Sequence, residues 1–162
     1  MPTLNDWLKK WKLETLSFNT GFMSAEIKFN NADRNAAWEM YVELLTRITT
    51  QHLEPEHGDE KSALTSIYSL FNLTREIIKK NGSGCIEFAK IAIVILNQVI
   101  RPFTAKWHKI SLESGFSNEE NRKVFREELN EIQKLLRKYT QMLADVAEVE
   151  DLTNLEHINN EV

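Results

Sequence analysis

The chain has 162 residues, a mass of 18.9 kDa, 42% apolar residues and a formal net charge of −4. These values are typical of a globular protein of one domain and exclude a strongly basic nucleic-acid-binding chain. The acidic residues after position 149 account for the whole net charge, so residues 1–149 are neutral and have no broad basic field for gripping duplex DNA. We therefore expect one domain over residues 1–149, followed by an acidic flexible tail over residues 150–162.

The composition also predicts a compartment. A single cysteine, Cys85, cannot form an intrachain disulfide, and the N-terminus has no apolar core of the length that a secretory signal needs. The apolar run Ile91–Ile100 is ten residues long, whereas a membrane span needs about 20. We therefore interpret this run as a core helix and expect a protein of the reducing cytoplasm.

Within the first 32 residues the spacing of the apolar side chains changes from that of a helix to that of a strand. Thr3 can cap a short helix, because the apolar residues of Leu4–Trp11 recur at helical spacing. Residues Met23–Phe29 then alternate strictly between apolar and polar, which is typical of a strand. The segment Leu13–Phe18 could pair with this strand across a short turn, and the pair would form a small β-hairpin.

Long helices are predicted for most of the remaining chain. Apolar residues at helical spacing predict one helix from Asp33 to about His52 and another from Asp59 to Lys80, separated by a loop that contains proline and glycine. A third helical segment covers residues 85–110. Pro102 lies within this segment and lacks an N–H group, so it should kink the helix or begin a new one.

The last predicted helix begins at a capping box formed by Ser117 and Glu120. Behind it, apolar residues recur at alternating spacings of four and three, which is the pattern of a heptad seam. The seam must cover either the rest of the protein or a second copy of the chain, and we expect it to be the interface of a homo-oligomer. Its residues are Phe125, Leu129, Ile132, Leu136, Tyr139 and Leu143. All these elements together predict an all-α bundle of four to five helices.

Three of the predicted helices carry polar side chains where a core would be apolar. These lines of polar residues are either solvated faces with i,i+4 ion pairs or the parts of one buried network. In a buried network Glu43 would neutralise one of the arginines, because an unpaired buried charge is very costly. The predicted members of this network are Glu43, Arg47, Arg75, Asn97 and Arg101.

Arg101 and His108 form the sharpest chemical candidate, because they share one helix face. The histidine could move a proton near neutral pH while the guanidinium stabilises charge on a phosphodiester. This spacing within a helical bundle resembles the HEPN superfamily of helical ribonucleases, in which an arginine and a histidine form an active site at a homodimer interface. The resemblance implies a metal-independent ribonuclease acting on RNA, with Arg101 and His108 as catalytic residues. Pro102 departs from that family, which usually has a polar residue after the arginine.

Three segments resemble a second family, an uncharacterised bacterial helical family associated with conflict and anti-phage gene neighbourhoods. The segments are AAWEMYVELLTRITTQ, GDEKSALTSIYSLFNLTREI and LNQVIRPFTAKWH. This resemblance implies a non-enzymatic interaction or regulatory module with a protein partner in a bacterial cytoplasm. We favour this function over the ribonuclease, and we favour a structural role for Arg101 over a catalytic one. The residues that carry the resemblance are Trp38, Arg47, Gly58, Asp59, Arg75, Arg101, Trp107 and His108.

No metal or cofactor is predicted. The stretch His52–Glu60 gathers potential ligands, but their spacing matches neither zinc nor calcium sites, so we expect a solvated acidic loop. The sequence has no P-loop, Rossmann glycine pattern or Gly-x-Ser-x-Gly motif. Cys85 has no nearby cation to activate it and is expected to belong to the core.

Overall fold

The computed structural model describes residues 2–13, 16–18, 20–47 and 59–153, and within these ranges the protein is helical. A 3-10 turn precedes each of the helices α5 and α7, and a π-helical segment, Leu96–Ile100, joins α5 to α6. The all-α class predicted from the sequence is therefore confirmed. The helices are α1 (Leu4–Lys10), α2 (Thr20–Ser24), α3 (Asn31–Leu45), α4 (Glu60–Asn81), α5 (Ile86–Ile95), α6 (Arg101–Leu112) and α7 (Glu119–Ala147).

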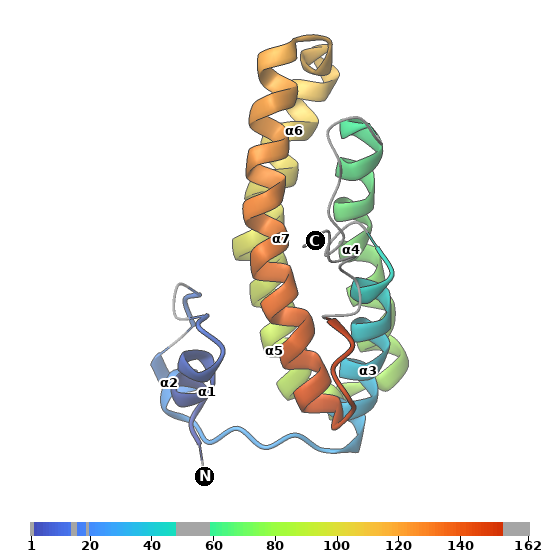
Figure 1. Cartoon of the computed structure of the whole chain (residues 1–162). Coiled ribbons are helices and arrows are strands. Elements are labelled where there is room, and N and C mark those ends of the chain that lie inside the picture. Colours follow the sequence, from blue (N-terminus) through green and yellow to red (C-terminus); the bar gives the residue numbers. More distant parts are fainter. Residues whose placement is uncertain (1, 14–15, 19, 48–58, 154–162) are drawn as a thin grey trace, which may run out of the picture.

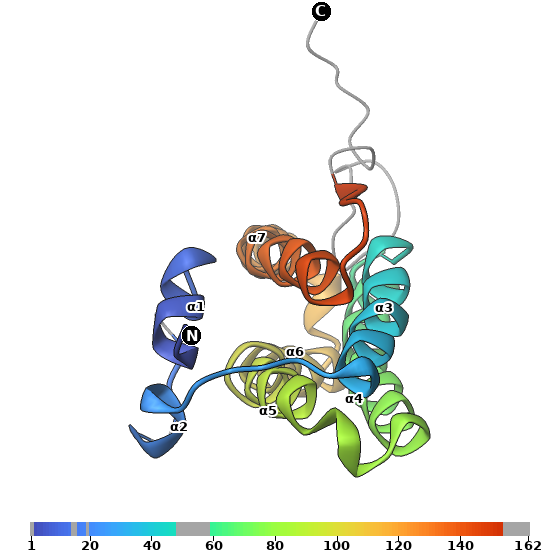
Figure 2. The same cartoon turned by 90° about the horizontal axis from the view of Figure 1, so that it is seen from below.

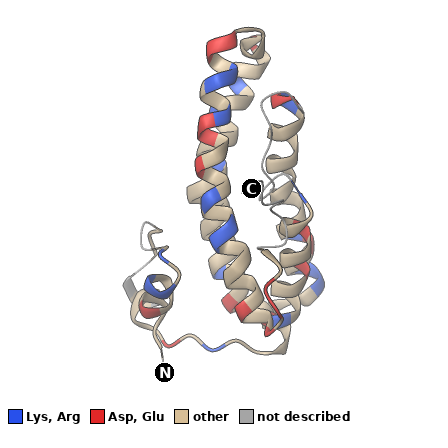
Figure 3. Cartoon of the chain, in the orientation of Figure 1, with Lys and Arg blue, Asp and Glu red and all other residues tan. Residues whose placement is uncertain are grey.

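The bundle consists of α3, α4, α7 and the nearly continuous rod of α5 and α6, while α1 and α2 lie to one side (Figures 1 and 2). Helix α7 packs along α3, α3 packs on α4, and α4 packs on α6. The largest side chains that are fully buried include Trp107, Tyr41, Phe88 and Phe125. Basic and acidic residues alternate along the exposed side of α7 (Figure 3), consistent with a neutral body.

Side-chain caps fix where several helices begin. The Thr3 hydroxyl accepts a hydrogen bond from the Asp6 N–H, and Asp59 accepts one from the Ser62 N–H at 2.8 Å. Both bonds satisfy an N–H group that the first turn of a helix leaves without a partner. At the other end of α4, Gly82 has a φ of 73°, a left-handed conformation that glycine adopts without steric cost.

Asp33 joins the beginnings of two helices. Its Oδ2 accepts from the Asn30 N–H at 3.0 Å and completes a capping box for α3, while its Oδ1 accepts from the Phe88 N–H of α5 at 3.0 Å. The carboxylate is fully buried, and both of its oxygens have a hydrogen-bond donor. The same side chain thus caps α3 and fixes the position of α5 against it.

The predicted β-hairpin is wrong. Thr20–Ser24 forms α2, and the only β feature among the described residues is an isolated bridge between Thr3 and Glu26. The alternating pattern instead marks an extended segment with one buried face, since Ile27 is buried and Phe29 packs on Trp7 with ring centroids 5.4 Å apart. An extended segment needs a neighbouring strand to become a sheet, and the Leu13–Phe18 segment does not supply one in its described part.

The boundary between α5 and α6 falls beside Pro102, as the sequence predicted. Pro102 is the second residue of α6, and the π-helical turn before it accommodates the missing N–H. By length and composition, Ser83–Leu112 is the one stretch in the described ranges that could cross a membrane. Half of its most apolar window is buried inside the protein, and a core helix passes the same test.

Two expectations about the C-terminal part need correction. Asn118, not Ser117, caps α7, because Gly115–Ser117 forms a 3-10 turn in which the Ser117 hydroxyl donates to the Ser114 carbonyl at 2.6 Å. The heptad seam is also not open to a second copy of the chain, because its side chains pack within the protein's own core. Those side chains are Phe125, Leu129, Ile132, Leu136, Tyr139 and Leu143.

The first described residues of the expected acidic tail lie against the bundle. The Leu152 N–H donates to the Tyr41 hydroxyl at 2.6 Å, and Thr153 is buried. The rest of the tail, residues 154–162, lies outside the described residues, so its flexibility stays a prediction. The N-terminal helix shares the core of the bundle through Leu4, Trp7 and Leu8.

Candidate functional sites beside helix α4

The predicted polar network is divided into two separate groups. Arg47 pairs with Glu43 at 2.9 Å and reaches the Ser69 hydroxyl at 3.4 Å, whereas Arg101 donates to the Asn97 side chain at 3.1 Å. No hydrogen bond or ion pair joins the two groups in the described part of the chain. The groups separate because α3 and α6 contact different faces of α4.

The network is also not buried, which corrects the second part of the expectation. Asn97 and Arg101 are exposed, and about a third of the Glu43 and Arg47 side chains is exposed to solvent. Their charges therefore remain hydrated, and no buried counter-charge is needed to hold Arg101. The simpler interpretation, solvated faces with i,i+4 pairs, describes Glu43 and Arg47.

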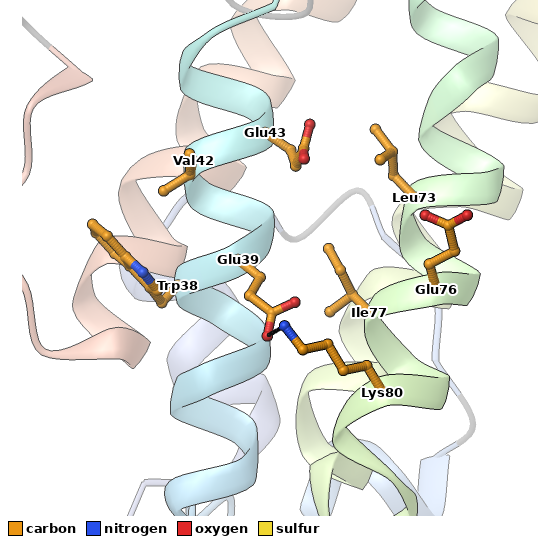
Figure 4. A pocket seen from close by; sticks show the side chains of 8 residues that line it. All are labelled: Trp38, Glu39, Val42, Glu43, Leu73, Glu76, Ile77 and Lys80. Atoms are coloured by element: carbon orange, nitrogen blue, oxygen red, sulfur yellow. Dashed lines mark ion pairs between the residues drawn. The ribbon is translucent and has the colours of Figure 1, made fainter.

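The first candidate site is a groove between α3 and α4 with a volume of about 350 Å³. An ion pair between Glu39 and Lys80, 3.2 Å long, connects the two helices across this groove (Figure 4). Glu43 and Glu76 lie further along the groove, and Trp38 and Val42 line it from α3. The remaining lining residues are Leu73 and Ile77.

The groove combines exposed apolar side chains with glutamates that outnumber its basic residues. Trp38 is 47% exposed and Val42 is 39% exposed, and the Trp38 ring stacks on Tyr41 with centroids 5.9 Å apart. Glu76 accepts a hydrogen bond from the Asn72 amide at 3.0 Å but has no basic partner among the described residues. An exposed aromatic side chain and a carboxylate that line one groove can meet different parts of one ligand, the ring its apolar atoms and the carboxylate its basic atoms.

The second candidate site is a smaller pocket between α4 and α6, with a volume of about 180 Å³. Arg101 and His108 both line it, so the structure brings the predicted pair together. Arg75 lines it from α4, together with Tyr68. We call this site the cationic pocket, and its other lining residues are Phe71, Thr104 and Ala105.

Aromatic rings contact the side chains of Arg101 and His108 in this pocket. The guanidinium carbon of Arg101 lies 4.8 Å from the ring centroid of Phe71, a cation–π distance. The His108 imidazole meets the Tyr68 ring edge to face, with centroids 4.9 Å apart. No carboxylate belongs to the described lining of this pocket, so its charge is entirely positive.

His108 and Thr104 line the cationic pocket and are candidates for acid–base and nucleophilic chemistry. A general base is normally held by a third group, but no described residue forms a hydrogen bond with His108. The Thr104 hydroxyl donates to the carbonyls of Ile100 and Arg101, at 3.1 and 3.2 Å, and is not poised as a nucleophile. Two guanidinium groups beside an imidazole can instead hold an anion through charge-assisted hydrogen bonds.

The cysteine of the chain, Cys85, belongs to the core. Cys85 is buried and donates to the Gly82 carbonyl at 3.1 Å, and burial raises the pKa of its thiol, so it stays protonated near neutral pH. No group of three potential metal ligands occurs among the residues that were described. Residues 52–58, where the sequence gathers such ligands, lie outside that part of the chain.

The sequence pattern missed Tyr68 and Glu76 as site residues. Tyr68 lies seven positions before Arg75, a spacing that puts both on one helix face, so this part of the cationic pocket could have been found. Glu76 gave no such signal, because a glutamate on a solvated helix is common. Comparisons of this chain with protein-family models, with curated proteins and with solved structures found no match.

Proposed function

We propose that this chain is a non-enzymatic helical interaction module that binds a protein partner in the groove between α3 and α4. The observation that carries the proposal is the half-exposed Trp38 beside this groove. Tryptophan is enriched among the residues that dominate binding energy at protein interfaces, because its large rigid ring buries much area at low entropic cost.

The charge of the groove indicates the chemistry of the partner. Glu39, Glu43 and Glu76 line it together with Lys80. The acidic excess, and above all Glu76, would be complemented by a lysine or arginine of the partner. We therefore propose that the occupant is a partner segment that presents an apolar side chain to Trp38 and a basic side chain to Glu76.

The cellular setting of this module is also a proposal. The sequence resemblance to a bacterial family of conflict and anti-phage neighbourhoods supports a partner encoded beside this protein, in a bacterial cytoplasmic defence system. Homo-oligomer formation stays a prediction as well, and it needs a surface other than the seam of α7, whose side chains are buried.

The test is site-specific photo-crosslinking followed by affinity measurement. A photoreactive residue at position 38 should crosslink the product of a neighbouring gene, and Trp38→Ala should weaken binding of that purified protein about tenfold or more. Glu76→Gln should weaken it less and mainly at low salt, because it removes one charge pair. Leu112 is 88% exposed at the far end of α6, so Leu112→Ala is the matched control. Equal binding by all variants would contradict the proposal.

A ribonuclease remains a second candidate, because Arg101 and His108 line the same pocket. In that case the purified chain degrades RNA, and His108→Ala abolishes the activity while leaving the melting temperature unchanged, because the His108 ring lies at the surface of the bundle with no described hydrogen bond. RNA that stays intact with the wild-type chain would remove this candidate.

A further inference from the structure

We propose that the cationic pocket is a binding site for a dianionic phosphate monoester. This site is independent of the groove between α3 and α4, because the two share no lining residue. The proposal follows from the charge, the shape and the aromatic walls of the pocket.

The charge of the pocket matches a dianion. Arg75 and Arg101 supply two permanent positive charges, and no described carboxylate neutralises either of them. Arg75 makes no described hydrogen bond or ion pair. The Arg101 guanidinium packs on the Phe71 ring and its Nε donates to Asn97, while its Nη atoms have no described hydrogen bond. A phosphate monoester carries a charge of about −1.5 to −2 at pH 7, whereas a phosphodiester or a carboxylate carries −1.

The donors also suit phosphate geometrically. A guanidinium group presents its N–H donors in a planar fork that matches two oxygens of one phosphate. Arg75 lines the pocket from α4 and Arg101 lines it from α6, so a phosphate bound there can meet a guanidinium from each helix. His108, from the same wall as Arg101, can donate to a third oxygen.

The volume and walls indicate how the rest of the ligand lies. A pocket of about 180 Å³ accepts a phosphoryl group and a few more atoms but not a long chain. Tyr68 lines this pocket and is 52% exposed, so the part of its ring that Phe71 and His108 leave uncovered is available to a planar group attached to the phosphate. Residues 1–149 carry no net charge, which disfavours the backbone of a polynucleotide.

The experiment titrates the full chain with three small probes that share one ring, using nuclear magnetic resonance or calorimetry at pH 7.5. The probes are phenyl phosphate, methyl phenyl phosphate and benzoate. We expect phenyl phosphate to bind about tenfold tighter than either monoanion, with amide shifts at Arg75, Arg101 and His108. Arg75→Gln and Arg101→Gln should each weaken phenyl phosphate binding about tenfold while the melting temperature stays unchanged, because both side chains are exposed.

The control variant removes the same charge one helical turn away. Lys79→Gln lies four residues after Arg75 on α4 but lines a different pocket, so it should change the affinity less than about twofold. The proposal is overturned if phenyl phosphate does not bind, if the Arg75 variant binds it as tightly as the wild type, or if methyl phenyl phosphate binds equally well. Trp38→Ala should leave phenyl phosphate binding intact, so this result separates the pocket from the proposed partner groove.

Discussion

Two buried polar side chains, those of Asp33 and Tyr139, differ in their hydrogen bonding. The Asp33 carboxylate has a backbone donor at each oxygen, whereas the Tyr139 hydroxyl is buried without a hydrogen-bond partner in the described part of the chain. An unsatisfied buried hydroxyl costs free energy that a benzyl ring of the same shape would not. Asp33 therefore stabilises the fold through its hydrogen bonds, and Tyr139 stabilises it through its ring.

This difference predicts the effect of Tyr139→Phe. At pH 7 the free energy of unfolding should stay the same or rise by up to about 1 kcal/mol, because the substitution removes an unsatisfied polar group. The matched control is Tyr41→Phe, which should cost about 1 kcal/mol because the Tyr41 hydroxyl accepts from the Leu152 N–H. Chemical denaturation of the three proteins measures both effects.

The same residue predicts a pH dependence. Burial raises the pKa of the Tyr139 phenol well above its ordinary value of about 10. Above pH 10 the unfolded chain loses this proton while the folded chain keeps it, so the free energy of unfolding should fall as the pH rises. Below pH 10 both states hold the proton and this contribution is constant. A wild-type chain that loses no more stability than Tyr139→Phe between pH 9 and 11 would contradict the prediction.

Among the elements, helices with a one-sided apolar pattern could be predicted from the sequence. The spacing of apolar residues located α4 and α7 nearly to the residue, since both are long. The stop signal of α4 was correct, and the predicted cap of α7 lay one residue too early. The prediction of a β-hairpin was wrong for a physical reason. Alternation reports an extended backbone with one buried face, and that requirement is met by residues 25–30 packing on α1 without a sheet.

For the candidate sites, the sequence could predict which residues share one helix but not which helices pack against each other. Arg101 and His108 could be paired from the sequence because a single helix carries both. Glu43 pairs with one of the predicted arginines, Arg47, but no described contact joins this pair to Arg101, since that link depended on which face of α4 receives α3. The phosphate proposal needs Arg75 and Arg101 in one pocket, and only the packing of α4 against α6 brings them there.

At the scale of the whole molecule, the N-terminal part is attached to the bundle by a small number of polar contacts as well as by its apolar residues. The Ser17 N–H donates to Gln98 Oε1 at 2.8 Å, and Gln98 Nε2 donates back to the Ser17 carbonyl at 2.5 Å. Lys10 pairs with Asp145 of α7 at 3.6 Å, and both side chains are about half exposed. Gln98 lies in the π-helical segment, so this segment is one of the places where the N-terminal part contacts the bundle.

Gln98→Ala should therefore loosen the N-terminal part without unfolding the bundle. Loss of these two hydrogen bonds at an exposed site costs about 1 kcal/mol, so hydrogen exchange of the Leu13 and Leu16 amides should accelerate about fivefold. Amides in the middle of α7 should exchange at the wild-type rate, because they open only with the whole bundle. Asn97→Ala is the matched control, since Asn97 is the residue next to Gln98 and its side-chain amide accepts from Arg101, not from the N-terminal part. Equal acceleration in both variants would mean that the π-helical segment itself, and not the contact with Ser17, holds the N-terminal part in place.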